Sequence, residues 1–189
     1  VAYADEGIEL RRAGISVPIM VMNAERNSFE NIISNNLEAV IYSPKMLNEF
    51  ISVLDGRNVS VHIEIETGMN RLGFNENEID ELISILQSNK NISVQSVFSH
   101  LAASEDATLD NFTSSQIKLF EERSEKIISA LKIKPLRHLL NSAGISRFTN
   151  AHFDMVRLGL GLYGIDSTHA LKERLKNVSV LKTTISQVK

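Results

Sequence analysis

Short runs of β-forming residues alternate with amphipathic helical stretches along most of this chain. The strand-like runs cover residues 1–3, 18–22, 39–42, 60–66, 92–98, 136–140 and 153–158. Helical patterns separate them, such as the apolar spacing over 79–86 that follows the capping pair Asn75 and Glu78. Another helix is predicted to start at Ser43, with Pro44 in its first position. Strands that alternate with helices form βαβ units around a parallel sheet. Seven such runs favour a nearly closed (β/α)₈ TIM barrel over an open, doubly wound sheet.

Composition limits the classes of partner that the chain can bind. Its 189 residues suffice for one large domain, and 43% apolar with 23% charged residues is an ordinary globular composition. A net charge of −3 with mixed signs gives no basic surface for nucleic acid or membranes. No apolar run reaches the roughly 18 residues of a membrane helix. The absence of cysteine fits a reducing compartment, so we expect a cytoplasmic protein.

Both ends of the chain have the character of cuts within a longer protein. The chain starts inside a strand-like run, with acidic Asp5 and Glu6 where a signal peptide would be apolar. A short helix is predicted over about 170–176. The final segment, 178–189, is β-like throughout. We therefore expect residues 178–189 to begin the connection to a following β-domain.

The strand-like run 60–66 carries the strongest chemical signal. Its residues alternate strictly, so His62, Glu64 and Glu66 share one face and the apolar residues share the other. In a barrel the apolar face meets the helices, and the polar face points inward. Buried carboxylates are costly unless paired, so cations must lie nearby, and Arg71 follows within a few residues. A structural ion-pair network inside the barrel is an equally good interpretation of these residues alone.

Five blocks in order resemble the alanine racemase family. They span about Tyr3 to Gly164 and are the segments 6–15, Glu64–Gly73, Ser99–Asp106, Asn141–Gly144 and Asp154–Gly164. Each block alone is a weak signal, but five in family order are specific. The resemblance implies a pyridoxal 5'-phosphate (PLP) binding barrel, with residues 1–177 as its strands 2–8 and with its first βα unit missing.

The resemblance also assigns residues to the ring of the cofactor. It implies that Arg71 hydrogen-bonds the phenolic oxygen and that Arg157 faces the pyridine nitrogen, with His100 holding Arg157 in place. Many family members have a carbamylated lysine where this chain has Glu64, which supplies a negative charge directly. A buried arginine needs an anion or acceptor in any interpretation, whereas a lone histidine such as His100 is more often an ordinary hydrogen-bonded side chain.

A second set of residues corresponds to the phosphate site of the family. The resemblance implies that Asn141, Ser142 and the backbone N–H groups of Gly159 and Leu160 hold the phosphate. This agrees with the rule that barrels bind phosphate on the loops after strands 7 and 8. Asn141 and Ser142 could instead simply cap a helix.

Neither proton-transfer base of the family lies in this segment. The Schiff-base lysine of the family belongs to the first barrel strand, and none of the lysines here has its sequence setting. The tyrosine base belongs to the C-terminal β-domain, and Tyr163 is a barrel-strand residue that should not be mistaken for it. We therefore expect no catalytic residue in this segment and no activity of the segment alone.

The resemblance predicts the activity of the whole protein and leaves alternatives. The whole protein would be a homodimer that interconverts L- and D-alanine with PLP and supplies D-alanine for the cell wall. One alternative is a metal-dependent barrel hydrolase using His62, Glu64 and His100. Another is a non-catalytic PLP-binding barrel. A third alternative is a racemase that acts on serine or another amino acid, which the sequence does not distinguish from an alanine racemase.

Overall fold

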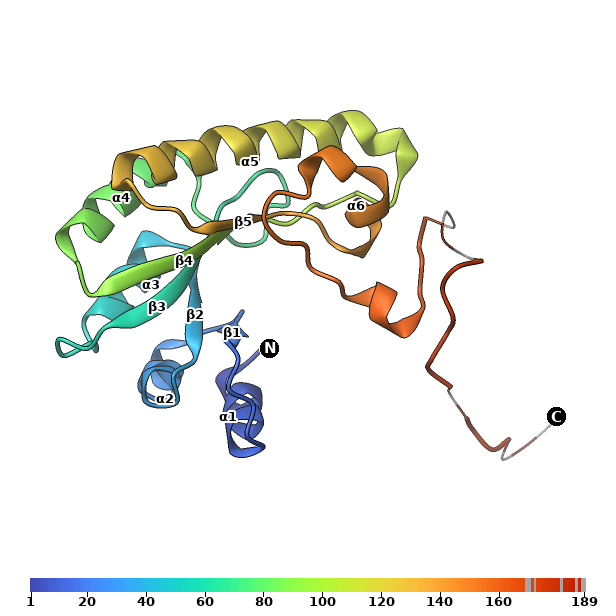
Figure 1. Ribbon diagram of the computed structural model, residues 1–189, viewed down its shortest axis with the longest axis horizontal. Helices are drawn as coiled ribbons and strands as arrows, with labels where there is room; N and C mark the ends of the chain where they lie inside the picture. Colours follow the sequence, from blue (N-terminus) through green and yellow to red (C-terminus); the bar gives the residue numbers. More distant parts are fainter. Residues whose placement is uncertain (169–170, 172, 181, 186, 188–189) are drawn as a thin grey trace.

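The fold is built on one parallel β-sheet. The computed structural model describes residues 1–168, 171, 173–180, 182–185 and 187. The sheet has five strands in the order β1-β2-β3-β4-β5 (Figure 1). These are β1 (Met20–Val21), β2 (Glu38–Ile41), β3 (Val59–Glu64), β4 (Ile92–Phe98) and β5 (Leu136–His138). All neighbours pair in parallel and follow chain order, which is the winding of a barrel and lacks the reversal of a doubly wound sheet.

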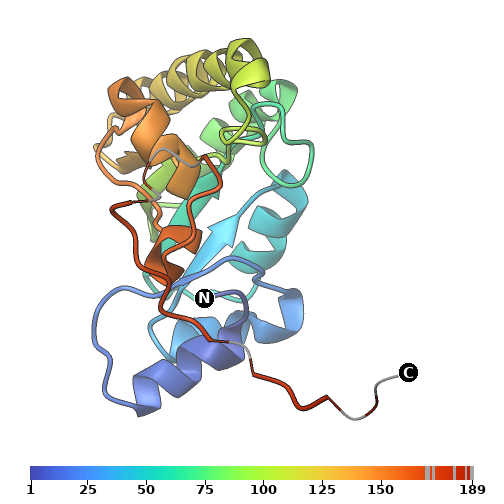
Figure 2. The same cartoon turned by 90° about the vertical axis from the view of Figure 1, so that its right-hand side faces the viewer.

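Helices connect the strands. They are α1 (Ala4–Arg12), α2 (Phe29–Ser34), α3 (Pro44–Ile51), α4 (Ile79–Ser88), α5 (Asp110–Leu131) and α6 (Ser142–Arg147). Figure 2 shows them spread around the sheet, from α1 and α2 at one end to α5 at the other. The predicted start of α3 is confirmed, because Ser43 Oγ accepts the backbone N–H of Met46 across 3.2 Å, with Pro44 in the first position. Within the described ranges no helix has the length and apolarity needed to cross a bilayer.

Apolar residues between the sheet and its helices form the core. On β3 and just beyond it, Val61, Ile63 and Ile65 are almost fully buried and belong to one cluster with Leu82 of α4 and Phe120 of α5. The predicted alternation along this strand is therefore confirmed. The helices take the apolar face, which leaves the polar face for the interior of the curved sheet.

Strand β4 carries a β-bulge opposite β3. Val61 pairs with Val94, but the next residue, His62, pairs with Ser96, so Gln95 is an extra residue of β4. A bulge of this kind changes which side chains of the bulged strand share a face. It places Ser96 beside His62 at the interior, where Ser96 is completely buried.

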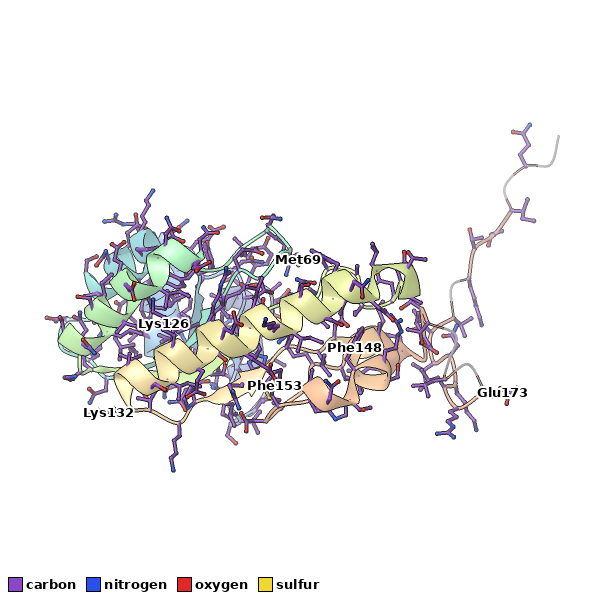
Figure 3. All side chains as sticks on the ribbon, turned by 90° about the horizontal axis from the view of Figure 1, so that it is seen from above. Met69, Lys126, Lys132, Phe148, Phe153 and Glu173 are labelled. Carbon is purple, nitrogen blue, oxygen red and sulfur yellow. The ribbon has the colours of Figure 1, made fainter. Side chains whose placement is uncertain are left out.

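The predicted strand over 153–158 is wrong as a continuous strand. Only Met155 forms a bridge, to His138, although Asp154 N donates to the carbonyl oxygen of Arg137 in β5 and Arg157 N to that of Leu140 just after it. Phe153 interrupts the extended backbone with a φ of 50° and packs edge to face on Phe120 of α5, with ring centroids 5.1 Å apart (Figure 3). The segment therefore runs beside β5 with too few regular pairs to form a strand.

Both ends of the chain also differ from the predictions. Residues 1–3 form no strand, although the carbonyl groups of Val1 and Ala2 accept N–H groups from the chain just after β1. Residues 170 and 172 of the helix predicted over 170–176 lie outside the described residues, and the described Leu171, Glu173 and Arg174 form turns. The described residues of the final segment, up to 187, contain no strand, so its predicted β-structure is not seen there.

Candidate functional site

The polar face of β3 and the turn that follows it lie buried inside the curved sheet. His62, Glu64 and Glu66 are only 7%, 2% and 8% exposed, as the alternation predicted. Glu66 has a local partner, because its carboxylate accepts the backbone N–H of Gly68 in the turn after the strand. Gly73 closes this turn with a φ of 120°, and a Cβ there would lie 2.5 Å from the backbone nitrogen of Glu66. Only glycine lets the turn fold back this closely.

Glu64 is the one acid of this face with an unsatisfied oxygen. Its Oε2 is buried and has no hydrogen-bond partner. Burial raises the pKa of Glu64, whereas the positive charges of Arg71 and Arg157 lower it and the neighbouring Glu66 raises it. Arg71 itself is exposed, and none of the ion pairs in the described residues includes Glu64. The nearby cations were predicted correctly, but the direct ion-pair network is absent from this part of the chain.

Arg157 is held at the carboxyl ends of β4 and β5. Its Nη1 donates to Nδ1 of His138 across 2.5 Å, and its Nη2 donates to the carbonyl oxygen of Ser99 across 2.7 Å. Nη2 also lies 3.2 Å from Nδ1 of His100 and 3.3 Å from the carbonyl oxygen of Leu139. The predicted contact between His100 and Arg157 is therefore present, and the guanidinium is fixed from several directions.

Two neutral imidazoles make this arrangement possible. Burial, together with the positive charges of Arg157 and Arg71, lowers the pKa of His100 to about 4. Burial, Arg157 and His62 lower the pKa of His138 to about 3. Burial lowers the pKa of Arg157 to about 10, with Glu64 opposing the change, so Arg157 keeps its charge at neutral pH. Both histidines can therefore accept hydrogen bonds from a charged arginine.

Ser142 gathers backbone N–H groups from the segment after Arg157. Its Oγ accepts the N–H of Gly159 across 2.9 Å and that of Gly161 across 3.2 Å. Leu160, whose N–H the sequence predicted together with that of Gly159, lines the same cavity. A hydroxyl and two convergent N–H groups are a suitable set of donors for a phosphate.

Asn141 acts as a helix cap, as the alternative interpretation predicted. Its Oδ1 accepts the backbone N–H of Gly144 across 3.0 Å and the hydroxyl of Ser104 across 2.7 Å. These bonds fix the start of α6 and join it to the loop after β4. The side-chain NH₂ group of Asn141 is the part that could face a ligand.

One cavity joins these groups. It has a volume of about 500 Å³, within the usual range for small-molecule sites. The predicted cofactor residues that line it are His100, Asn141, Ser142, Arg157, Gly159 and Leu160. Arg71 is not among the lining residues, although its turn contributes Met69. A cavity of this size, lined by the Ser142 hydroxyl, the backbone of Gly159 and Leu160 and the charged Arg157, has the donors that a phosphorylated aromatic ring would require.

The residues proposed for a metal site do not come together. Among the described residues, no group of three or more His, Asp or Glu side chains could hold a metal ion. His62 is engaged with Ser96 and Glu38 through its two ring nitrogens, at 2.7 and 2.9 Å. His100 hydrogen-bonds Arg157. The geometry therefore gives no support to the hydrolase alternative.

Sequence reasoning missed three residues that organise the site. His138 is hydrogen-bonded to Arg157, and Ser96 is hydrogen-bonded to His138. The third residue is Gln116 of α5, which is fully buried. It accepts the backbone N–H of Ala102 and donates to the carbonyl oxygen of His100, which fixes the loop after β4. The polar residues within the strand-like runs 92–98 and 136–140 were the available signal for Ser96 and His138. Gln116 carries no such signal, because a glutamine on a long helix is usually exposed.

The fold and cavity together define a class of protein. A parallel sheet wound in chain order, with a ligand-sized cavity at the carboxyl ends of its strands, is a barrel-type α/β domain. Residues 1–167 match the family model described as "Alanine racemase, N-terminal domain". The chain belongs to this family.

Individual relatives agree with this assignment. The chain is 35% identical to an alanine racemase of Sorangium cellulosum over 192 residues, which cover 98% of the chain and 50% of that protein. The alanine racemase of Corynebacterium glutamicum superposes with a TM-score of 0.86 at 28% identity, covering 94% of this chain and 51% of the other. That of Clostridium difficile 630 in complex with cycloserine gives 0.83 at 30% identity, covering 94% and 50%. The chain thus spans about half the length of the relatives it matches.

Proposed function

We propose that the whole protein is a PLP-dependent alanine racemase and that this chain supplies most of the cofactor site. The observation that carries the proposal is the cavity that Arg157 and His100 line together with Ser142 and Gly159. The names of the relatives support alanine as the substrate. We place the enzyme in the bacterial cytoplasm, as a homodimer that supplies D-alanine for the cell wall.

Each residue of the chain has a distinct task in this proposal. When bound, PLP supplies a conjugated ring that stabilises negative charge at the α-carbon of an amino acid. Asn141 and Ser142, with the backbone N–H groups of Gly159 and Leu160, would bind the phosphate. Arg157 donates to the pyridine nitrogen and keeps it unprotonated, because a charged arginine disfavours a second cation beside it.

The phenolic oxygen of the cofactor depends on two charged residues near β3, Arg71 and Glu64. Arg71 reaches the phenolic oxygen from the turn, and the Glu64 carboxylate orients Arg71. The unsatisfied oxygen of Glu64 supports this role, because a buried acceptor without a partner has a donor to gain when the site fills. The lysine and tyrosine that exchange the α-proton belong to parts of the whole protein outside this chain. We propose that those parts also close the sheet into an eight-stranded barrel and add a β-domain.

Exchange of the α-proton tests the proposed activity. The whole protein, loaded with PLP, should replace the α-proton of L-alanine with deuterium in deuterated buffer and should form D-alanine. The 189-residue chain with PLP should show only the exchange of free PLP, because both bases lie outside it. Faster exchange of serine than alanine would make the protein a different racemase. PLP binding without any exchange would make it a non-catalytic carrier.

A further inference from the structure

Five polar side chains form an unbroken hydrogen-bonded chain through the interior of the curved sheet. They are Arg157, His138, Ser96, His62 and Glu38. Nη1 of Arg157 lies 2.5 Å from Nδ1 of His138, whose Nε2 lies 2.9 Å from Ser96 Oγ. Ser96 Oγ lies 2.7 Å from Nδ1 of His62, whose Nε2 lies 2.9 Å from Glu38 Oε2. The chain thus runs from the cofactor cavity to the amino end of β2.

The Arg157 end of this chain determines the direction of the first two bonds, and a single hydrogen on His62 would give the remaining bonds the same direction. An arginine can only donate, so Nδ1 of His138 must be unprotonated and Nε2 must carry the hydrogen. That hydrogen is donated to Ser96, whose own hydroxyl hydrogen is then free for Nδ1 of His62. The remaining hydrogen of His62, on Nε2, is donated to Glu38, and an ionised carboxylate can only accept. His138, Ser96 and His62 then each donate one hydrogen bond and accept one, all in the same direction along the chain.

The backbone and the neighbouring rings hold the members of the chain in place. The bulge at Gln95 is what brings Ser96 opposite His62, since regular pairing would place Gln95 there. The His138 ring stacks on Phe98 with an interplanar angle of 4° and a centroid distance of 4.8 Å. The guanidinium of Arg157 lies over the same Phe98 ring, 5.1 Å from its centroid. These contacts leave His138 little freedom to rotate.

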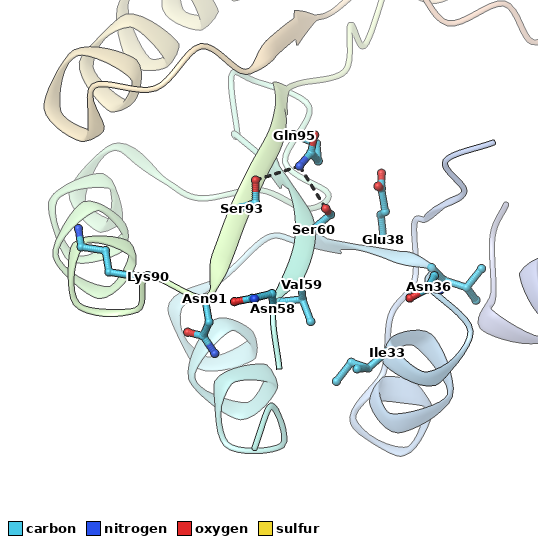
Figure 4. Close-up of a pocket in the computed structure, with 11 residues that line it drawn as sticks. Ile33, Asn36, Glu38, Asn58, Val59, Ser60, Lys90, Asn91, Ser93 and Gln95 are labelled. Atoms are coloured by element: carbon cyan, nitrogen blue, oxygen red, sulfur yellow. Dashed lines mark hydrogen bonds between the residues drawn. The ribbon is translucent and has the colours of Figure 1, made fainter. Parts of the chain in front are cut away.

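Glu38 lies at the far end of the chain from the cofactor cavity. Its side chain is 16% exposed and lines a separate cavity of about 370 Å³ at the amino ends of the strands. Figure 4 shows Glu38 there beside Ser60 and Gln95, whose amide donates to Ser60 and Ser93. Glu38 is therefore fixed to the backbone of β2, while its carboxylate lies near solvent.

We propose that Glu38, His62 and Ser96 are positioning residues that hold His138 in its Nε2–H form, so that its Nδ1 remains an acceptor for Arg157. If His62 were instead protonated on both nitrogens, it would also donate to Ser96, and the hydroxyl hydrogen of the buried Ser96 would lose its acceptor in this chain. Glu38 and Ser96 prevent this by giving each hydrogen one acceptor. The consequence for the cofactor rests on the proposed role of Arg157, whereas the arrangement of hydrogens does not.

Nuclear magnetic resonance of ¹⁵N-histidine-labelled whole protein without cofactor tests the arrangement. Two-bond ¹H–¹⁵N couplings show which ring nitrogen carries hydrogen, and the variants His62→Gln and His138→Gln assign the signals. We expect hydrogen on Nε2 and none on Nδ1 in both rings. Hydrogen on Nδ1 of His138, or on both nitrogens of His62, would overturn the proposal.

Variants along the chain test whether positioning reaches Arg157. Ser96→Ala should give two tautomers of His138 and speed the exchange of the Arg157 guanidinium protons with water by roughly tenfold, as expected for one lost buried hydrogen bond. Ser96→Thr keeps the hydroxyl and should restore both measurements. Unchanged tautomers and exchange in Ser96→Ala would contradict the proposal.

If Ser96→Ala fails to fold, the milder substitution Glu38→Gln, at the end of the hydrogen-bonded chain farthest from Arg157, tests the same proposal. Glu38→Gln offers a donor as well as an acceptor, so His62 should show two tautomers while the fold is kept. Glu81→Gln, at an exposed glutamate of α4, is the control and should change nothing. One tautomer of His62 in Glu38→Gln would overturn the role of Glu38. Correct tautomers without PLP binding would overturn the proposed function and leave this inference standing.

Discussion

The hydroxyl oxygen of Ser142 accepts the backbone N–H of Gly159 across 2.9 Å, which links the start of α6 to the segment after Arg157. Ser142→Ala removes the hydroxyl, so PLP affinity should fall by about 0.5–1.5 kcal/mol, or roughly two- to tenfold in Kd. Ser146→Ala is the matched control, because the Ser146 hydroxyl only donates to Ala143 within α6. Absorbance titration with PLP measures the effect. Equal affinities of both variants would show that Ser142 does not bind the phosphate.

Glu64→Gln should weaken PLP binding or turnover by disordering Arg71. The expected loss is on the order of 1.5–3 kcal/mol, as for a charge-assisted hydrogen bond. Glu64→Lys should recover function only where bicarbonate is present to carbamylate the new lysine. Titrations with and without carbon dioxide measure this difference. Equal function of Glu64→Lys in both conditions would show that the site does not need a negative charge there.

The depressed pKa of His138 should make the protein less stable in acid. His138 is neutral in the folded protein down to about pH 3, whereas in the unfolded chain it takes up a proton below about 6.5. The unfolded state therefore binds more protons between these values. The free energy of unfolding should fall with pH there by up to about 1.4 kcal/mol per unit.

Urea unfolding at a series of pH values measures this effect. Below pH 6.5, His138→Gln should lose part of the slope of the wild type, because glutamine does not titrate. Glu64 acts in the opposite sense, since its raised pKa stabilises the fold at low pH, but it is the same in both proteins. Parallel slopes for the two proteins would mean that His138 is not buried in its neutral form.

The sequence predicted those parts of the fold that depend on local pattern. The alternation around β3 assigned His62, Glu64 and Glu66 to the interior, because a strand with one apolar face has only one way to pack. The start of α3 at Ser43 and Pro44 was equally local. In contrast, the strand expected over 153–158 depends on a regular partner at its outer edge, which no local pattern reveals.

The site was predicted only where motifs could be compared with a family. Resemblance brought His100, Arg157 and Ser142 to one cavity, and the geometry agrees. It did not reveal Ser96 and His138, because their meeting depends on the extra residue at Gln95, which arises from the pairing of two strands. The sequence placed Arg71 near Glu64, and the charge of Arg71 does lower the pKa of Glu64, but the absence of a direct ion pair between them depends on the conformation of an exposed turn.

The most direct test of the account is Arg157→Glu in the PLP-loaded whole protein. Placing a carboxylate at the pyridine nitrogen should favour its protonation, slow racemisation by about 10- to 100-fold and increase transamination as a side reaction. The absorbance spectrum of the bound cofactor should change as well. Arg12→Glu, at an exposed arginine of α1, should leave both the rates and the spectrum as they are. An unchanged spectrum and racemisation rate in Arg157→Glu would contradict the proposed cofactor site.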